Sequence, residues 1–249
     1  MPGEKSLSSV AEHYERLLAP IYLWLAGGMD AAIARGRAEV HAVCAHPANN
    51  QWALDLGAGF GMHAMPLADM GYSVVAIDTS AVLLEVLRRE LAARSIKIIR
   101  DDLTSFKRHI TVPPALIVCM GDTLTHLPDL QSVEGLFADV AHALKPGGSF
   151  VLAFRDYSIA LNGAERFIPV RSDADRILTC FLEYGDGAVT VHDILHERDG
   201  AGWRQCVGAY RKLRLSTGWV VGALESKGFQ VRHEPGIAGM TRVIAMRPA

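Results

Sequence analysis

Three glycines at alternating positions follow a short apolar run that contains one acid. The run ends in Asp55 and Leu56, and Gly57, Gly59 and Gly61 come next. Glycine allows a positive φ and lets a ligand approach where a Cβ would collide. Free N–H groups at the start of a following helix suit a polar or anionic group. The segment therefore predicts a strand, a tight turn and a helix that together cradle a cofactor.

The spacing of these glycines argues against a nicotinamide cofactor. The dinucleotide fingerprint places glycines at the first, third and sixth positions, and the sixth position counted from Gly57 is Met62. A second acid, Asp78, closes the apolar run 72–78. It follows the first glycine by about 20 residues, where a strand-end carboxylate accepts hydrogen bonds from ribose hydroxyls. The dinucleotide pattern fails, but the ribose-binding acid is in place.

The acid before the first glycine, the third glycine at Gly61 and the strand-end acid Asp78 resemble the first motifs of class I S-adenosylmethionine-dependent methyltransferases. The turn Leu-Lys-Pro-Gly-Gly at 144–148 is a second resemblance to this family. Together they cover about residues 52–156, more than a third of the chain. The resemblance implies S-adenosylmethionine as cofactor, S-adenosylhomocysteine as product, and methyl transfer to an N or O nucleophile of a small metabolite.

The same resemblance implies a set of cofactor contacts at the carboxyl ends of the strands. Asp102 and Leu103, after the third strand, match the acid and the apolar residue that contact the adenine amine and ring face in the family. Tyrosine faces near the turn can hold a sulfonium. The implied contacts are Tyr14, Tyr22, Asp55, Gly57, Gly59, Gly61, Asp78, Thr79, Asp102, Leu103, Met120 and Gly121.

Candidate acceptor-side residues follow the fourth and fifth strands. Methyl transfer from a sulfonium is an in-line displacement that needs positioning and exclusion of water, and a base only if the acceptor arrives protonated. His126 is the candidate base, four residues after Asp122, which is placed to orient it. Its alternative is a histidine that only shapes the loop. Arg155 and Tyr157 can hold an acidic substrate or close the cavity, and the alternative for Arg155 is a surface ion pair.

Two acids, Asp122 and Asp156, end adjacent strands and raise the alternative of a metal-assisted O-methyltransferase similar to the catechol enzymes. Such sites pair the second Asp with Asn, but Tyr157 follows Asp156 here, so we predict no metal. His192 and His196 would lie about 13 Å apart on a strand, too far to share an ion. The remaining alternatives are a nicotinamide oxidoreductase and a non-catalytic subunit that binds the cofactor without turnover.

Alternating strand and helix patterns from residue 52 predict a parallel α/β sheet. The resemblance implies its Rossmann-like, seven-stranded form, mostly parallel with a terminal antiparallel hairpin. The expected organisation is one methyltransferase domain over 1–249, made of a helical cap (1–48), the cofactor-binding core (49–157), an inserted antiparallel sheet (158–215) and a C-terminal helix and strands (216–249).

The cap has a helical periodicity. The spacing of its apolar residues predicts a helix from Ser8 to Leu18, interrupted at Pro20, and a second helix that is capped by Asp30 and reaches about Cys44.

The insertion has the periodicity of strands. Runs at 176–184, 188–198 and 203–215 predict an antiparallel meander over the pocket mouth. A meander at this place resembles the glycine, sarcosine and amino-sugar N-methyltransferases. One of its faces can be pocket, oligomer contact or solvent surface. That face carries Thr190, His192, Ile194, His196 and Arg198.

Composition limits the partners. The chain has 25 Lys and Arg against 27 Asp and Glu, a formal charge of −2, and its basic residues are scattered, so the charge pattern of a nucleic-acid binder is missing. No apolar segment predicts a signal peptide or membrane span, and the four cysteines lack metal or disulfide spacing. We expect a cytoplasmic enzyme with a small-molecule acceptor and no nucleic-acid or membrane partner, and we allow for a homodimer.

Overall fold

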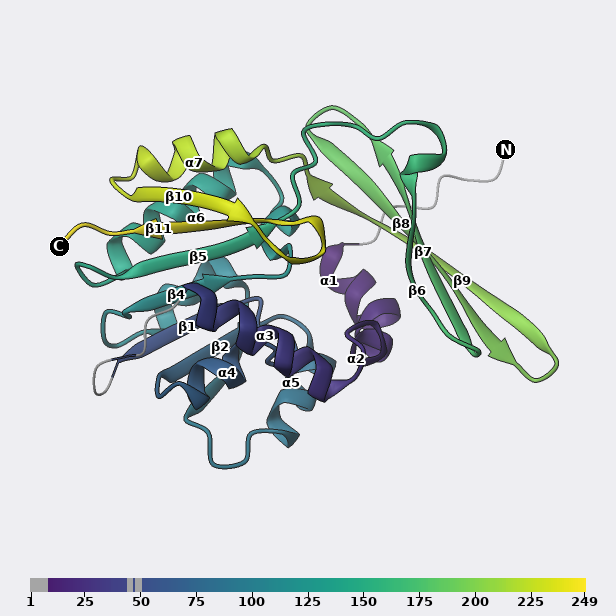
Figure 1. Cartoon of the computed structure of the whole chain (residues 1–249), viewed down its shortest axis with the longest axis horizontal. Helices are drawn as coiled ribbons and strands as arrows, with labels where there is room; N and C mark the ends of the chain where they lie inside the picture. Colours follow the sequence, from purple (N-terminus) through teal and green to yellow (C-terminus); the bar gives the residue numbers. More distant parts are fainter. Residues whose placement is uncertain (1–8, 44–46, 48–50) are drawn as a thin grey trace.

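The computed structural model describes residues 9–43, 47 and 51–249 of the 249-residue chain. Figure 1 shows a larger sheet flanked by helices, a smaller sheet beside it, and the N-terminal helices α1 and α2 between the two. Within the described residues, no single helix is long and apolar enough to span a membrane. The pair Val10–Leu25 and Met29–Val43, bent by 82°, has the required length and composition only when both are taken together.

The larger sheet has seven strands in the order β10-β11-β5-β4-β1-β2-β3. β11 runs antiparallel to both of its neighbours, and the other pairs are parallel. The predicted Rossmann-like sheet with a terminal antiparallel hairpin is therefore confirmed. Its strands are β1 (Trp52–Leu56), β2 (Ser73–Asp78), β3 (Ile96–Arg100), β4 (Leu116–Cys119), β5 (Ser149–Phe154), β10 (Gln230–Pro235) and β11 (Thr241–Met246).

Helices cover both faces of this sheet because successive strand side chains point to opposite sides. Leu54 and Leu56 of β1 pack in one cluster with α6 and α7, whereas Ala53 packs in another with α3, α4 and α5. Ser80 caps α5 by accepting a hydrogen bond from the N–H of Leu83. The helices are α3 (Met29–Val43), α4 (Ala64–Asp69), α5 (Ala81–Arg89), α6 (Leu130–Ala143) and α7 (Thr217–Glu225), with 3₁₀ turns η3 (Leu103–His109), η4 (Thr123–His126), η5 (Gly163–Arg166) and η6 (Ile237–Gly239).

The smaller sheet is antiparallel in the order β6-β7-β8-β9. The three predicted runs correspond to its last three strands, and β6 is an additional strand. The register of β6 shifts between Pro169 and Arg171, which breaks the alternation by which a strand is recognised. The strands are β6 (Phe167–Ser172), β7 (Arg176–Tyr184), β8 (Ala188–Asp199) and β9 (Gly202–Leu213).

The N-terminal segment is a bent helical path of four short pieces. Pro20 lies in the first turn of a 3₁₀ piece, where its missing N–H is not needed. The predicted interruption at Pro20 is therefore a change of helix type and not an end. α3 begins at Met29, so Asp30 lies in its first turn and is not its cap; the predicted limits Ser8 and Cys44 lie outside the described residues. The pieces are α1 (Val10–His13), a π-helix η1 (Tyr14–Leu18), η2 (Ala19–Ile21) and α2 (Tyr22–Leu25).

Candidate active site

The glycine turn lies at the carboxyl end of β1. All three glycines have positive φ, +79° at Gly57, +52° at Gly59 and +91° at Gly61. A Cβ at Gly61 would lie 2.4 Å from Leu87 Cδ1 of α5, and one at Gly57 would lie 2.4 Å from Thr123 Cγ2. At Gly59 the nearest atom would be 3.6 Å away. Packing within the protein therefore requires glycine at two of the positions, whereas Gly59 leaves room above the turn.

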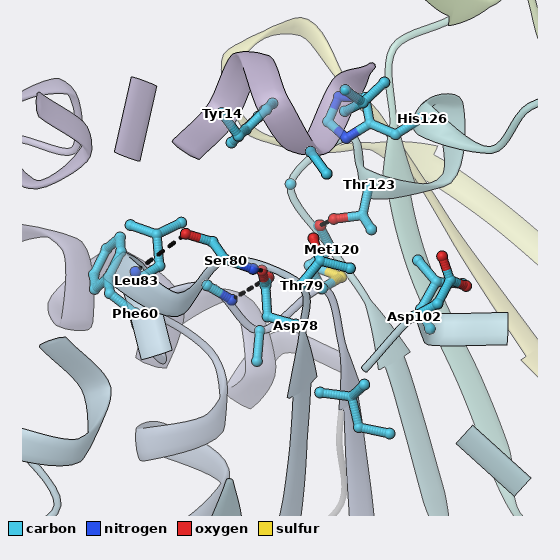
Figure 2. A pocket seen from close by; sticks show the side chains of 18 of the residues that line it. Tyr14, Phe60, Asp78, Thr79, Ser80, Leu83, Asp102, Met120, Thr123 and His126 are labelled. Carbon is cyan, nitrogen blue, oxygen red and sulfur yellow. Dashed lines mark hydrogen bonds between the residues drawn. The ribbon is translucent and has the colours of Figure 1, made fainter. Parts of the chain in front are cut away.

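Asp78 holds this turn in place. Its Oδ2 accepts a 2.8 Å hydrogen bond from the N–H of Gly59, and its Oδ1 accepts one of 2.8 Å from the N–H of Ser80 (Figure 2). Burial raises the pKa of this carboxyl, and the hydrogen bonds from Ser80 and Gly59 oppose the rise. Because Asp78 lines a cavity, its remaining lone pairs can accept hydrogen bonds from the hydroxyls of a ligand.

A cavity of 240 Å³ lies above the turn. In Figure 2, Tyr14 and His126 lie across it from Asp78 and Asp102. The predicted site residues that line it are Tyr14, Tyr22, Gly57, Gly59, Asp78, Thr79, Asp102, Leu103, Met120, Gly121 and His126. Other lining residues that follow the same strand ends were not predicted from the sequence: Phe60, Ser80, Leu83 and Thr123. Their positions next to the turn, to Asp78 and to β4 are the signal that could have found them.

Two predicted cofactor contacts, Asp55 and Gly61, are not among the residues that line this cavity. Asp55 is 1% exposed, and its Oδ2 has no hydrogen-bond partner among the described residues. Burial raises the pKa of this carboxyl to about 6. A buried oxygen without a hydrogen-bond partner lowers the stability of the fold. Asp55 Oδ2 is such an oxygen, and it can accept a hydrogen bond beneath the turn.

A second cavity, of 690 Å³, adjoins the first, because Tyr14, Tyr22 and Gly121 line both. Arg155 and Tyr157 line this second cavity. Among the described residues, the guanidinium of Arg155 has no ion-pair partner, so the surface ion pair considered for it is absent there. Of the predicted acceptor-side residues, Arg155 and Tyr157 thus line the second cavity and His126 lines the first, with Tyr14 and Tyr22 at the junction.

The smaller sheet forms one wall of the second cavity. The face of β8 that forms this wall is the opposite of the face considered in the sequence analysis. Val191 and Asp193 of β8 line the cavity together with Tyr210 of β9. Strand alternation places the other set of β8 side chains on the outer face. The face that carries Thr190, His192, Ile194, His196 and Arg198 is therefore not the wall of this cavity.

Asp122 is the polar centre of the second cavity. Its Oδ1 accepts a 2.8 Å hydrogen bond from the N–H of Arg155. Its Oδ2 accepts bonds from Lys212 Nζ at 2.5 Å and from the hydroxyl of Tyr157 at 3.3 Å. Burial would raise the pKa of Asp122, but the neighbouring Lys212 ammonium holds it below its usual range. Lys212 was missed because Arg211 beside it is also basic, and the sequence does not tell which of the two points inward.

His126 is half-buried, and its Nε2 is a buried atom with no hydrogen-bond partner among the described residues. Its ring meets those of Tyr14 and Tyr210 edge-on, with centroids 5.3 and 5.8 Å apart. Burial lowers the pKa of His126 to about 3, helped by the charge of Lys212. The expected orientation by Asp122 is wrong, since both oxygens of Asp122 bond other groups. His126 is thus a neutral ring at neutral pH.

The N-terminal segment ties the two sides together. Gly208 of β9 leaves a gap that His13 fills, since a Cβ there would lie 2.6 Å from the ring. His13 Nε2 lies 2.6 Å from Asp193 Oδ2 in the smaller sheet. Two residues on, Glu15 accepts hydrogen bonds from the Ser80 hydroxyl at 2.6 Å and the N–H of Ala81 at 3.1 Å, both at the start of α5. Tyr14, between these two ties, is thereby fixed over both cavities.

The metal alternative finds no support in the arrangement of the acids. Asp156 accepts hydrogen bonds from Ser158 and from the N–H and hydroxyl of Thr217, and Asp122 is paired with Lys212. In the part of the chain that the structure describes, no group of three His, Cys, Asp or Glu side chains could hold a metal ion.

Comparison with known proteins decides the family of the central segment. Residues 53–148 match the family model described as a methyltransferase domain. This segment is a methyltransferase domain. It contains the glycine turn, Asp78 and the loop after β4, so the residues around the first cavity lie mostly within it.

The relatives of this methyltransferase domain transfer methyl groups to both nitrogen and oxygen. The glycine/sarcosine N-methyltransferase of Aphanothece halophytica is 30% identical over 112 residues, which are 44% of this chain and 42% of that protein. The ubiquinone biosynthesis O-methyltransferase of Azoarcus sp. (strain BH72) is 32% identical over 120 residues, 45% of this chain and 49% of that protein. The chain spans about half the length of the curated relatives it matches.

The likeness of fold extends over nearly the whole chain. The CcbJ methyltransferase of Streptomyces caelestis superposes with a TM-score of 0.74 at 19% identity, over 95% of this chain and 98% of that one. The smaller sheet and the N-terminal helices are thus part of a shared architecture. The predicted class I methyltransferase fold is confirmed.

Proposed function

We propose that this chain transfers a methyl group from S-adenosylmethionine to a nitrogen or oxygen nucleophile of a small molecule. The methyltransferase domain supports this proposal, and the observation that carries it is the cavity above the glycine turn with Asp78 in its wall. When bound, S-adenosylmethionine supplies an electrophilic methyl group on a sulfonium.

The residues of the first cavity fit this cofactor. Asp78 keeps lone pairs for the ribose hydroxyls, and Gly59 leaves room for a close approach of the ligand. Asp102 and Leu103 are assigned to the adenine end. Asp55, with its unpaired Oδ2, suits a polar donor beneath the turn. The tyrosine rings at the junction are assigned to the sulfonium end, where their faces attract a cation.

The second cavity is assigned to the acceptor. Arg155 and Tyr157 line it, and His126, which lines the first cavity, contacts the rings of Tyr14 and Tyr210 in its wall. The rings of Tyr14, Tyr157 and Tyr210 that line the second cavity help to exclude water, as a displacement at a sulfonium requires. We assign His126 to positioning through its unpaired Nε2, because a neutral ring with a pKa near 3 takes up no proton at neutral pH. A cytoplasmic location and a homodimer stay predictions from the sequence.

The test is transfer of a labelled methyl group. The protein is incubated with S-adenosylmethionine labelled in its methyl group and with a small-molecule extract, and labelled products are separated by chromatography. We expect label in a small molecule, and none with Gly59→Val, whose side chain fills the first cavity. Cofactor binding without any transfer would instead favour the non-catalytic subunit.

A further inference from the structure

Lys212 brings a permanent charge into the acceptor cavity. It is 8% exposed on β9 and lines the cavity beside Asp122. The rings of Tyr157 and Tyr210 flank its Nζ, with centroids at 5.9 and 5.7 Å. Burial works against the charge, but the carboxylate of Asp122 holds the pKa of Lys212 above its ordinary value. An ammonium has three N–H donors, and the described residues supply one acceptor, Asp122 Oδ2.

The carboxylates around the cavity are already engaged. Asp122 accepts three hydrogen bonds. Asp193 is bonded by His13 and by the thiol of Cys180 at 2.8 Å. The four that line the cavity and have such partners are Glu39, Asp122, Asp156 and Asp193. A cationic acceptor would therefore find only carboxylates that already bond other groups, whereas an acceptor oxygen would find N–H donors of Lys212 that no described residue accepts.

The charge of Lys212 reaches the junction of the two cavities. Burial raises the pKa of Tyr22 and of Tyr157; in both cases the Lys212 ammonium opposes the rise and the Asp122 carboxylate adds to it. Tyr22 lines both cavities. The same field acts on any hydroxyl bound beside it. The charged or titratable groups that face Lys212 are Tyr22, Asp122, His126, Arg155, Tyr157, Cys180 and Tyr210.

We propose that the methyl acceptor is an acidic hydroxyl compound, a phenol or an enol with an apolar body, and that its oxygen is bound as an anion facing Lys212. Apolar side chains of the smaller sheet such as Leu178, Leu182 and Val191 suit the body of this molecule. This inference rests on the proposed function and chooses oxygen over nitrogen within it.

The step balances without a protein base. The hydroxyl proton leaves to bulk water when the acceptor binds as an oxyanion. The oxygen lone pair then forms the new O–C bond while the S–C bond breaks, and the bonding pair stays on sulfur. The products are a neutral methyl ether and S-adenosylhomocysteine. A neutral His126 is consistent with this scheme because the acceptor brings no proton to remove.

The test measures the ionisation of a bound probe. 4-Nitrophenol, whose phenolate absorbs visible light, is titrated with acid and base in the presence of excess full-length protein and S-adenosylhomocysteine. We expect a pKa lower than in free solution by one unit, a tenfold change in the ionisation constant. Lys212→Arg should keep most of this shift. The double variant Lys212→Met with Asp122→Asn, which leaves no unpaired charge, should abolish it.

Three outcomes would overturn the inference. One is that 4-nitrophenol does not bind, or binds with an unshifted pKa, while S-adenosylhomocysteine binds normally by calorimetry. Another is that the double variant binds S-adenosylhomocysteine normally and keeps the full pKa shift. The third is that 4-nitroaniline, the uncharged analogue, binds the parent protein more tightly than 4-nitrophenol does. Failure of S-adenosylhomocysteine to bind the parent protein is a different result, which would remove the proposed function itself.

Discussion

The two cavities are built in different ways. The first is organised around consecutive strand ends, where glycines and one carboxylate form a turn open to a ligand. The second is lined by side chains from segments far apart in the sequence. Polar groups from such segments pair there inside the protein, as Asp122 does with Lys212 and Asp193 with His13. Backbone geometry thus suits a cofactor shared by a family, and paired side chains suit an acceptor that differs between its members.

The largest effect should come from breaking the pair in the second cavity. Asp122→Ala leaves the Lys212 ammonium buried without its carboxylate, a change that costs about 3–5 kcal/mol. We expect urea unfolding to show a loss of this size. Asp139→Ala is the control, because its pair with Lys107 is half exposed and such pairs contribute about 1 kcal/mol or less. Equal losses in the two variants would mean that the buried pair is dispensable.

A variant of Asp55, beneath the first cavity, should change the stability of the protein in the opposite direction to Asp122→Ala. In Asp55 the pKa is raised from 3.8 to about 6. The native state therefore holds this proton more tightly than the unfolded chain, and stability falls as the pH rises from about 4 through about 6. Asp55→Asn removes that cost and should stabilise the protein by about 1–3 kcal/mol at pH 8, with no gain at pH 3.5. A gain of the same size at both pH values would contradict the raised pKa.

The first cavity could be predicted from the sequence because its signals are local. Gly57, Gly59 and Gly61 are spaced within one turn, and Asp78 follows at the end of the next strand, so the periodicity that predicts the strands also places these residues together. The strand order follows from the same alternation of apolar runs. Most of the predicted cofactor contacts accordingly line one cavity.

The second cavity could not be predicted because its pairs carry no local pattern. Lys212 and Asp122 are 90 residues apart, and His13 and Asp193 are 180 apart. Only the folded chain shows that Asp122 bonds Lys212 in place of His126. The inward face of β8 was equally undetermined, since alternation gives two faces and does not say which one meets the core.

Variants of two glycines in the turn separate a role in packing from a role in ligand binding. Gly61→Ala places a Cβ 2.4 Å from the fully buried Leu87 at a φ of +91°, and we expect a loss of about 1–3 kcal/mol of stability. Gly59→Ala has no such contact and a φ of +52°, so it should cost about 1 kcal/mol and mainly weaken cofactor binding. Thermal unfolding and calorimetry separate the two. Comparable stability in both variants would show that Leu87 yields to the new side chain.

The smallest effect should come from the tie between the N-terminal segment and the core. Glu15→Gln weakens the charge-assisted hydrogen bonds from Ser80 and Ala81. We expect the free energy of cofactor binding to become less favourable by about 1 kcal/mol, which is a roughly fivefold loss of affinity. Arg16→Gln, at an exposed neighbouring position, is the matched control. An unchanged affinity in Glu15→Gln would mean that the segment does not help to hold the cofactor.

The central claim is that the turn and Asp78 form a site for S-adenosylmethionine, and a calorimetric titration of the parent protein and of Asp78→Asn tests it most directly. We predict one site per chain for S-adenosylmethionine, competition by S-adenosylhomocysteine, no heat with NAD, and an affinity weakened by about 1–3 kcal/mol in the variant. Binding of NAD in place of S-adenosylmethionine, or equal affinities in the parent protein and the variant, would contradict the account.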